Sequence, residues 1–158
     1  MYKVAVLTVS DKCSQGQRED KSGKIVQELA KQLPAEIVRY EIIPDEPELI
    51  KQKLIDYCDN QKIDLVLTTG GTGFTERDLT PEATKGVIEK EVPGIPEAMR
   101  VGCLSLTKRA MLSRGISGIR SKTLIINLPG SSRGAKESLE AILEGLPHGL
   151  DMIAGKEH

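Results

Sequence analysis

The stretch DLVLTTGGTGFTERDLTPEAT, from Asp64 to Thr84, constrains the fold of this chain more than any other. It opens with a continuous apolar run, Leu65-Val66-Leu67, which indicates a strand buried on both faces, as in a parallel sheet. Gly70-Gly71-Thr72-Gly73 follows, and glycines permit positive φ and a close approach of backbone N–H groups to a ligand. Thr80-Pro81-Glu82 then predicts a helix start, in which the threonine caps, the proline takes the first helical position and the glutamate favours the positive helix end. The stretch therefore predicts a strand, a glycine loop and a helix in succession.

The glycine loop matches neither of two common phosphate-binding motifs. No Gly-Lys-Ser/Thr closes it, so it is not a Walker A loop, and Glu76 stands where a dinucleotide-binding fingerprint has its third glycine. Main-chain amides in such a loop can form a concave anion site. A glycine-rich turn without a ligand is the alternative that the loop alone leaves open.

Strands alternate with amphipathic helices along the whole chain. This alternation predicts an α/β fold, a three-layer αβα sandwich around a mostly parallel sheet, built as one domain over residues 1–158. The helix beginning at Pro81 is expected to end near Glu91, and a long helix is expected over Ile95–Ser113. The main expected strands are Lys3–Val9, Glu36–Ile43, Leu65–Thr68 and Thr123–Asn127.

Composition excludes several classes of protein. The formal net charge is −1, with one Phe and no Trp, which argues against a dedicated nucleic-acid binder. No apolar run approaches the about 20 residues of a membrane span, and the N-terminal sequence lacks the pattern of a signal peptide. Cys13, Cys58 and Cys103 lie far apart in no metal-binding pattern, which fits reduced thiols in a cytoplasmic protein.

Four loops follow predicted strands and are expected at the same edge of the sheet, where α/β proteins bind ligands. Two of them are rich in glycines and hydroxyls and lead into helix N-termini, which suits phosphates. Carboxylates and phosphates together suit Mg²⁺, which takes one or two carboxylates plus phosphate oxygens and water. The loops are Ser10–Asp20, Pro44–Pro47, Thr69–Thr80 and Asn127–Gly134, and their carboxylates are Asp11, Asp45, Glu46 and Asp78.

This combination indicates binding of a nucleotide or phosphate ester and, less directly, transfer at phosphorus, in which a protein mainly positions groups and neutralises charge. The cations available for this are Lys12, Arg77, Arg114 and Arg133, each of which can equally be a surface residue.

The motifs resemble those of the molybdopterin adenylyltransferase family, whose relatives include the N-terminal domain of gephyrin and the corresponding domain of the plant molybdenum-cofactor enzyme. The resemblance covers essentially the whole chain and rests on four segments in the same order. They are VLTVSDKCSQG near the start, TTGGTGFTERDLTPEAT in the middle, then MLSRG, and LIINLPGSSRGAKE near the end.

The resemblance implies a molybdopterin-binding fold, assembled as a homotrimer, that adenylates molybdopterin with Mg-ATP and releases pyrophosphate ahead of metal insertion. It places the essential acidic positions at Asp45 and Asp78, and the serine of the LSR motif at Ser113. It places substrate and nucleotide contacts at Ser10, Asp11, Gly70, Gly71, Thr72, Gly73, Pro129, Gly130 and Ser131. We hypothesise that Asp45 and Asp78 hold the Mg²⁺ and orient the nucleotide.

Two alternatives to the enzyme stay open at this point. One is a non-catalytic molybdopterin-binding carrier or scaffold of the same pathway, and the other is a general nucleotide-binding module, against which the absent Walker lysine weighs. The resemblance also implies a downstream metal-insertion protein as a partner, without distinguishing molybdenum from tungsten as the final metal.

Overall fold

A computed structural model describes residues 1–156 of the chain, so the last two positions of the predicted 1–158 domain lie outside the described residues. Within the described part, the chain forms a six-stranded sheet in the order β2-β1-β3-β6-β5-β4. The pairs β1–β2, β1–β3 and β3–β6 are parallel, whereas β5 is antiparallel to both of its neighbours. The strands are β1 (Tyr2–Val9), β2 (Ala35–Ile43), β3 (Leu65–Thr69), β4 (Lys90–Glu91), β5 (Ser117–Arg120) and β6 (Thr123–Leu128).

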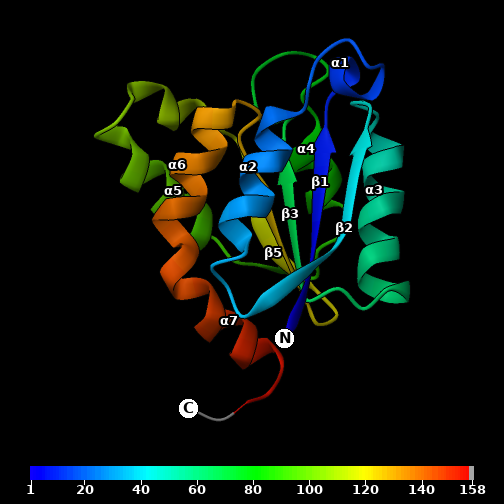
Figure 1. The fold of residues 1–158 in the computed structure, drawn as a ribbon, viewed down its shortest axis with the longest axis vertical. Helices are drawn as coiled ribbons and strands as arrows, with labels where there is room; N and C mark the ends of the chain where they lie inside the picture. Colours follow the sequence, from blue (N-terminus) through cyan, green and yellow to red (C-terminus); the bar gives the residue numbers. More distant parts are fainter. Residues whose placement is uncertain (157–158) are drawn as a thin grey trace.

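Helices cover both faces of this sheet (Figure 1). On one face α2 packs against α6, and α6 against α5, while α3 and α4 pack together on the other. The helical elements are α1 (Asp11–Ser14), α2 (Lys21–Ala30), α3 (Pro47–Ile55), the π-helical turn η1 (Asp56–Asn60), α4 (Thr80–Lys85), α5 (Gly94–Leu104), the 3₁₀ turn η2 (Lys108–Leu112), α6 (Ser132–Ile142), the 3₁₀ turn η3 (Leu143–Gly145) and α7 (Leu146–Ile153).

The central strands bury alternate residues in two separate cores. In β1, Val4 and Val6 join the core under α2 and α6, while Ala5 and Leu7 join the core under α3 and α4. Strands β3 and β6 alternate in the same way. Because both faces are covered, these strands are apolar throughout rather than alternating with polar residues. The predicted three-layer αβα sandwich around a mostly parallel sheet is therefore confirmed.

Two predicted helices differ from the structure. The helix from Pro81 ends at Lys85, not near Glu91, because Lys90 and Glu91 pair with β5 as an edge strand. The long helix over Ile95–Ser113 is split: α5 ends at Leu104, and Thr107 turns to extended backbone and caps η2 by accepting a hydrogen bond from the Arg109 amide. A threonine hydroxyl that bonds the local backbone competes with helix continuation, which explains the break.

The ligand-binding edge is set by how the chain crosses the sheet. Strand β1 lies between β2 and β3, so the chain leaves β1 for one side and then returns past it to the other. The loops after β1 and β3 start next to each other, but the connections that follow them run to opposite sides of the sheet. Open α/β sheets bind ligands at such a switch point. In Figure 1 the arrowheads of β1, β2 and β3 meet at this edge, beside α1, and the N-terminus lies at the opposite end.

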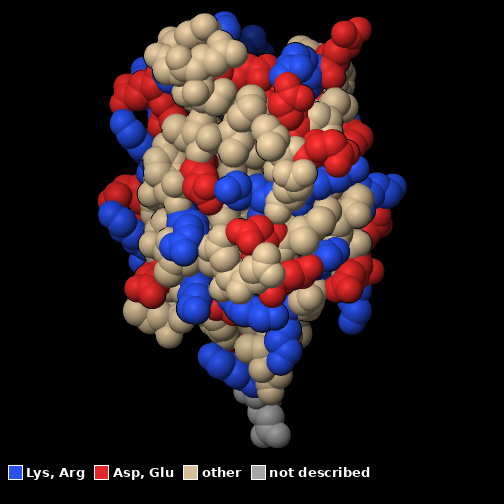
Figure 2. All heavy atoms as spheres, turned by 90° about the vertical axis from the view of Figure 1, so that its right-hand side faces the viewer, with Lys and Arg blue, Asp and Glu red and all other residues tan. Residues whose placement is uncertain are grey.

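The surface matches the nearly neutral composition. On the face that carries α3, acidic and basic side chains are interspersed without a continuous basic track (Figure 2). None of the helices formed by residues 1–156 combines the length and the apolar character that crossing a membrane requires.

Asn127 joins the sheet to the segments beside the ligand-binding edge. Its fully buried amide donates to the hydroxyls of Thr68 and Thr84, both at 3.0 Å, and its Oδ1 accepts from the Ile116 amide at 3.1 Å. We expect Asn127→Ala to lower the free energy of unfolding by about 3 kcal/mol, because two buried hydrogen bonds and one part-buried hydrogen bond are lost.

Urea denaturation at neutral pH measures this loss. The matched control is Asn60→Ala, which removes an exposed hydrogen bond to Asp56 and is expected to cost about 0.5 kcal/mol or less. Equal losses in the two variants would contradict a special role for the buried amide.

Candidate functional site

Two cavities open at the carboxyl edge of the sheet, on either side of a shared ridge. The first, called here the Asp45 cavity, has a volume of about 690 Å³ and is lined by the ends of β1 and β3, the start of α2, and Asp45. The second, the Ser113 cavity, has a volume of about 790 Å³ and lies between the glycine loop, α5, η2 and α6. The residues that line both cavities, called here the shared ridge, are Gly71, Asp78, Gly130 and Ser131.

The glycine loop needs its first two glycines for steric reasons. Gly70 has φ +102° and Gly71 has φ +71°, in the region that side chains rarely adopt. A Cβ on Gly70 would meet the Val9 carbonyl oxygen at 2.2 Å, and a Cβ on Gly71 would meet Thr80 Oγ1 at 2.1 Å. The backbone of the loop is thus pressed against β1 and against the start of α4.

Thr80 itself corrects a prediction. Leu79, not Thr80, occupies the cap position of α4, and Thr80 is the first helical residue. Its hydroxyl is fully buried beside Gly71 and has no hydrogen-bond partner in the described structure. A buried hydroxyl without a hydrogen-bond partner is uncommon and costs free energy of folding. The Thr80 hydroxyl lies against Gly71 of the shared ridge, so the packing at this place is not optimised for stability alone.

Arg114 holds the second half of the glycine loop. Its guanidinium donates to the Gly73 carbonyl at 2.8 Å and to the Asp78 carbonyl at 2.7 Å, and it pairs with Glu82 at 2.7 Å. Asp78 Oδ2 in turn accepts from the amide and the hydroxyl of Thr75, at 3.0 and 2.9 Å. The predicted cation Arg114 therefore positions the loop backbone, whereas Thr75 orients the Asp78 carboxylate.

Asp11 and Asp45 lock the loops after β1 and β2 together. The Asp11 amide donates to Asp45 Oδ2 at 2.9 Å, and the Asp45 amide donates to Asp11 Oδ1 at 3.0 Å. Arg77, from the glycine loop, forks onto Asp11 at 2.7 and 3.0 Å and reaches Glu46 at 3.0 Å. One arginine thus links three of the four loops predicted to build the site.

The two carboxylates of this pair have opposite pKa shifts. Hydrogen bonds from the Arg77 guanidinium, and then from the Asp45 amide, lower the pKa of Asp11. Burial raises the pKa of Asp45, and the nearby charges of Asp11 and Asp78 raise it further. Of these two carboxylates, Asp45 is the one whose ionisation is opposed by its surroundings, and a cation placed beside it would favour the ionised form.

The donor set fits a hard divalent cation that is completed by a ligand. Each of Asp45 and Asp78 uses Oδ2 for positioning, and the described structure contains no hydrogen bond to the Oδ1 atom of either. Both residues line the Asp45 cavity. Residues 1–156 contain no group of three or more His, Cys, Asp or Glu side chains that could hold a metal ion alone. Two carboxylates without further protein ligands fit Mg²⁺ bound with phosphate oxygens and water.

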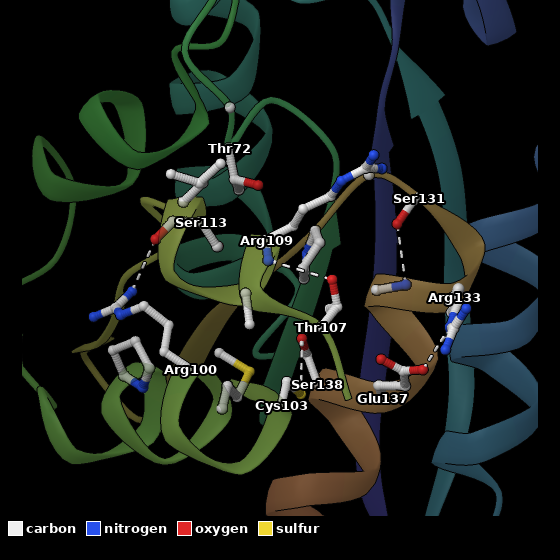
Figure 3. A pocket seen from close by; sticks show the side chains of 18 of the residues that line it. Thr72, Arg100, Cys103, Thr107, Arg109, Ser113, Ser131, Arg133, Glu137 and Ser138 are labelled. Carbon is white, nitrogen blue, oxygen red and sulfur yellow. Dashed lines mark hydrogen bonds and ion pairs between the residues drawn. The ribbon is translucent and has the colours of Figure 1, made fainter. Parts of the chain in front are cut away.

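The Ser113 cavity has a polar rim and an apolar interior. Ser113 ends η2, and Arg100 of α5 donates to the carbonyls of Ser113 and Gly115 at 3.2 and 3.1 Å. Figure 3 shows Arg100 and Ser113 on one side of this cavity and Ser131, Arg133 and Glu137 on the other. The apolar lining is supplied mainly by α5, η2 and the turn between them, through Pro96, Met99, Leu106 and Leu112.

The loop before α6 completes the ridge. Ser131 caps α6 by accepting from the Gly134 amide at 3.0 Å, and the Thr69 hydroxyl donates to the Pro129 carbonyl at 2.6 Å. The second bond ties this loop to the end of β3, so the glycine loop and the Pro129–Ser131 loop lie against each other. A helix N-terminus at this position favours an anion.

The structure brings together nearly all of the site residues predicted from the sequence. Asp45, Ser10 and Gly70 line the Asp45 cavity, whereas Ser113, Thr72, Gly73 and Pro129 line the Ser113 cavity. Asp11 lies behind Asp45 and positions it. Of the other predicted cations, Lys12 is exposed and lines neither cavity, and Arg133 pairs with Glu137.

Sequence reasoning assigned no role in the site to Asp20, Thr80, Arg100 or Arg109. Asp20 lines the Asp45 cavity, is 6% exposed, and accepts hydrogen bonds from Thr8, Ser22 and the Gly23 amide while it caps α2. Aspartate is a preferred residue at a helix N-cap, and Asp20 caps α2 through the Gly23 amide, which gives Asp20 a structural role. Arg100 and Arg109 carried no such signal, because only the packing of α5 and η2 places them in the lining of the Ser113 cavity.

Comparisons with known proteins decide the family. A family model described as a probable molybdopterin binding domain matches residues 5–148. The chain belongs to this molybdopterin-binding family. Helicobacter pylori molybdopterin adenylyltransferase is 48% identical over 155 residues, which cover 96% of this chain and 88% of that protein. Dictyostelium discoideum gephyrin is 44% identical over 97% of this chain, which corresponds to 23% of gephyrin.

A solved structure agrees with the assignment of this molybdopterin-binding domain. The molybdopterin biosynthesis enzyme MoaB from Thermus thermophilus superposes with a TM-score of 0.94 at 49% identity, covering 99% of this chain and 98% of that one. The resemblance read from the sequence motifs is therefore confirmed at the level of family and fold.

Gly71→Ala tests the tight packing of the glycine loop. A Cβ there combines a positive φ with a clash against Thr80 Oγ1, so we expect the free energy of unfolding to fall by about 2 kcal/mol or more. The control is Gly16→Ala, where φ is +75° but nothing lies within 4 Å of the added Cβ, so that variant isolates the backbone cost of about 1 kcal/mol. Chemical denaturation compares the two, and equal losses would show that the contact with Thr80 has no effect.

Asp45→Asn tests the cost of the buried charge. Because the pKa of Asp45 is raised in the folded state, the folded protein binds this proton more tightly than the unfolded chain, and its ionisation lowers stability as pH rises above the ordinary value of 3.8. We expect Asp45→Asn to be as stable as the parent or more stable at pH 7, with the difference narrowing as pH falls toward 3.8. Urea denaturation across this pH range measures it. A variant that is less stable at pH 7, with no narrowing, would contradict the effect of burial.

Proposed function

We propose that this protein is a molybdopterin adenylyltransferase, which transfers the adenylyl group of ATP to molybdopterin and releases pyrophosphate. The observation that carries the proposal is the pair of cavities that meet at the shared ridge, because a transfer between two substrates needs two adjoining sites with the reacting groups at their junction. The names of the relatives, molybdopterin adenylyltransferase among them, support the same reaction.

The linings of the two cavities suggest which substrate each one holds. The Ser113 cavity offers an apolar wall together with serine and threonine hydroxyls, which suits the pterin ring system. The Asp45 cavity offers the two carboxylates with free oxygens, which suits Mg-ATP. The terminal phosphate of molybdopterin and the α-phosphate of ATP would then meet at Gly71, Asp78 and Ser131.

The chemistry at the ridge requires positioning more than acid–base catalysis. An oxygen of the terminal phosphate of molybdopterin forms a bond to the α-phosphorus of ATP, and the bond from that phosphorus to the bridging oxygen breaks, so that pyrophosphate leaves with the electron pair. The attacking phosphate is already ionised, so no side chain has to remove a proton. What the protein must overcome is the repulsion between two polyanions.

Residues of this chain offset the repulsion between the two polyanions in two ways. The glycine loop and the N-terminus of α6 lie at the ridge, and backbone amides of a glycine loop and of a helix start favour anions. Asp45 and Asp78 would hold Mg²⁺ through their free Oδ1 atoms, and the bound ion would neutralise charge on the phosphates and on the leaving pyrophosphate. Arg77 and Arg114 act indirectly, because their guanidinium groups hold Asp11 and the loop backbone.

Three finer features belong to the same proposal. A homotrimer is supported by large apolar side chains exposed on α5 and η2, including Val101 at 70% and Met111 at 65% exposure. Delivery of the product to a downstream metal-insertion protein follows from the reaction itself, since an adenylylated pterin without metal is an intermediate. The cytoplasm stays a prediction from the cysteine pattern.

Asp78→Asn tests the reaction directly. Wild-type protein is expected to release pyrophosphate from Mg-ATP only when molybdopterin is added, with adenylyl-molybdopterin detected by mass spectrometry. Asp78→Asn is expected to slow this release by about 100-fold or more, because a charge that positions the cation at the junction is lost.

The control for this variant is Glu76→Gln, which removes a carboxylate from the same loop at an exposed position that lines neither cavity. Its rate is expected to stay within about twofold of wild type. Tight binding of molybdopterin by the wild-type protein without any pyrophosphate release would indicate the carrier instead of the enzyme.

A further inference from the structure

Three arginines line the Ser113 cavity, and they differ in what they contact. Arg100 donates to two backbone carbonyls, and Arg133 pairs with Glu137 at 2.8 Å. The guanidinium of Arg109 makes no hydrogen bond or ion pair with the described residues; its backbone amide alone is bonded, to Thr107 Oγ1 at 3.3 Å. Arg109 is thus the arginine of this cavity whose charge is free to meet a ligand.

The position of Arg109 directs its side chain toward the ridge. It lies in η2, which begins at the Thr107 cap and ends at Ser113. In Figure 3 the Arg109 side chain extends from η2 toward the loop that carries Ser131, across the cavity from its own backbone. Gly130 and Ser131 line the same cavity immediately before the first turn of α6.

The charges around the cavity make this arginine distinct from an ordinary surface cation. The other carboxylates in the lining are Asp78, which is oriented by Thr75, and Glu137, which is paired with Arg133 and has a side chain only 14% exposed. Neither holds Arg109. A guanidinium presents a planar fork of N–H donors that matches two oxygens of a phosphate, so a phosphate at the ridge would satisfy it.

We infer that Arg109 binds the phosphate group of the pterin substrate in the Ser113 cavity and thereby selects the phosphorylated pterin over its dephosphorylated form. The inference rests on the proposed function for the identity of the substrate. Arg109 closes over the phosphate from η2, opposite the backbone amides of the ridge and of the start of α6. It is a binding residue for the phosphate and takes no part in proton transfer.

The break between α5 and η2 is what makes this arrangement available. A helix continued through Thr107 would carry Arg109 along the axis of α5, whereas the turn at Thr107 folds η2 back over the cavity. The exposed apolar residues Leu106 and Leu112 accompany Arg109 on this segment and line the same cavity. The segment therefore offers an apolar surface to the ring system and a charge to its phosphate.

The test compares two ligands on two variants. Molybdopterin and its phosphatase-treated form are titrated into wild type, Arg109→Gln and Lys108→Gln by isothermal calorimetry under anaerobic conditions. Lys108 is the matched control, because it is the neighbouring exposed cation of η2 and does not line the cavity. We expect Arg109→Gln to weaken binding of molybdopterin about tenfold while leaving the dephosphorylated ligand unchanged. Lys108→Gln is expected to change either affinity less than about twofold.

Several outcomes would overturn the inference. Equal weakening of both ligands by Arg109→Gln would show a contact with the ring or a general loss of structure. Equal weakening by Lys108→Gln and Arg109→Gln would show a diffuse electrostatic effect, and unchanged binding would show no contact.

Failure of the proposed function is recognised separately in the wild-type protein. If wild type binds neither ligand, both the function and the inference fail. If wild type forms adenylyl-molybdopterin while Arg109→Gln binds both pterins normally, only the inference about Arg109 fails. Arg109→Lys adds a further comparison, because a lysine restores charge without the planar fork and is expected to recover only part of the affinity.

Discussion

The site depends on the parallel register of three central strands. Thr8 of β1 is opposite Thr69 of β3, and Thr69 is opposite Leu128 of β6, so these strands end at the same level. The loops that follow them therefore emerge side by side over a sheet that is buried on both faces. Because that burial holds the strands rigidly, groups on three loops distant in the sequence reach one ridge with little freedom to move apart.

The charges at this edge are organised around burial of one carboxylate. Asp45 is half-buried beside Asp11 and Asp78, and its burial together with these two charges raises its pKa. Arg77 compensates Asp11 instead, and Arg114 is occupied with the loop backbone and Glu82. Arg77 and Arg114 thus fix the shape of the site, whereas Arg18 and Lys21 line the Asp45 cavity itself. A divalent cation beside Asp45 would neutralise its carboxylate. The Thr80 hydroxyl, which packs against Gly71 of the shared ridge, has no hydrogen-bond partner among the described residues.

Much of this arrangement was predictable from local sequence, and the exceptions have physical causes. Apolar runs such as Leu65-Val66-Leu67 identify buried strands because no polar alternation is possible between two helical layers. The glycines of the loop predict positive φ angles, and Gly70 and Gly71 adopt them. The prediction of one helix over Ile95–Ser113 was wrong because helical periodicity says nothing about a threonine that turns back to cap the next segment. The helix predicted to reach Glu91 was wrong because pairing with β5, which lies far along the chain, outweighs local propensity.

Short stretches of the chain are sufficient to specify the class of fold, the succession of strands and loops, and most of the residues that gather at the ridge, because buried strands, glycine loops and helix starts are each encoded within a few neighbouring residues. Three-dimensional packing was needed to establish that the ridge separates two cavities, that Arg77 and Arg114 are occupied by protein partners, and that Arg109 is left with its guanidinium free. These properties depend on which side chains meet across elements far apart in the chain. A charge read from the sequence does not reveal whether it will face a partner, a backbone carbonyl or an open cavity.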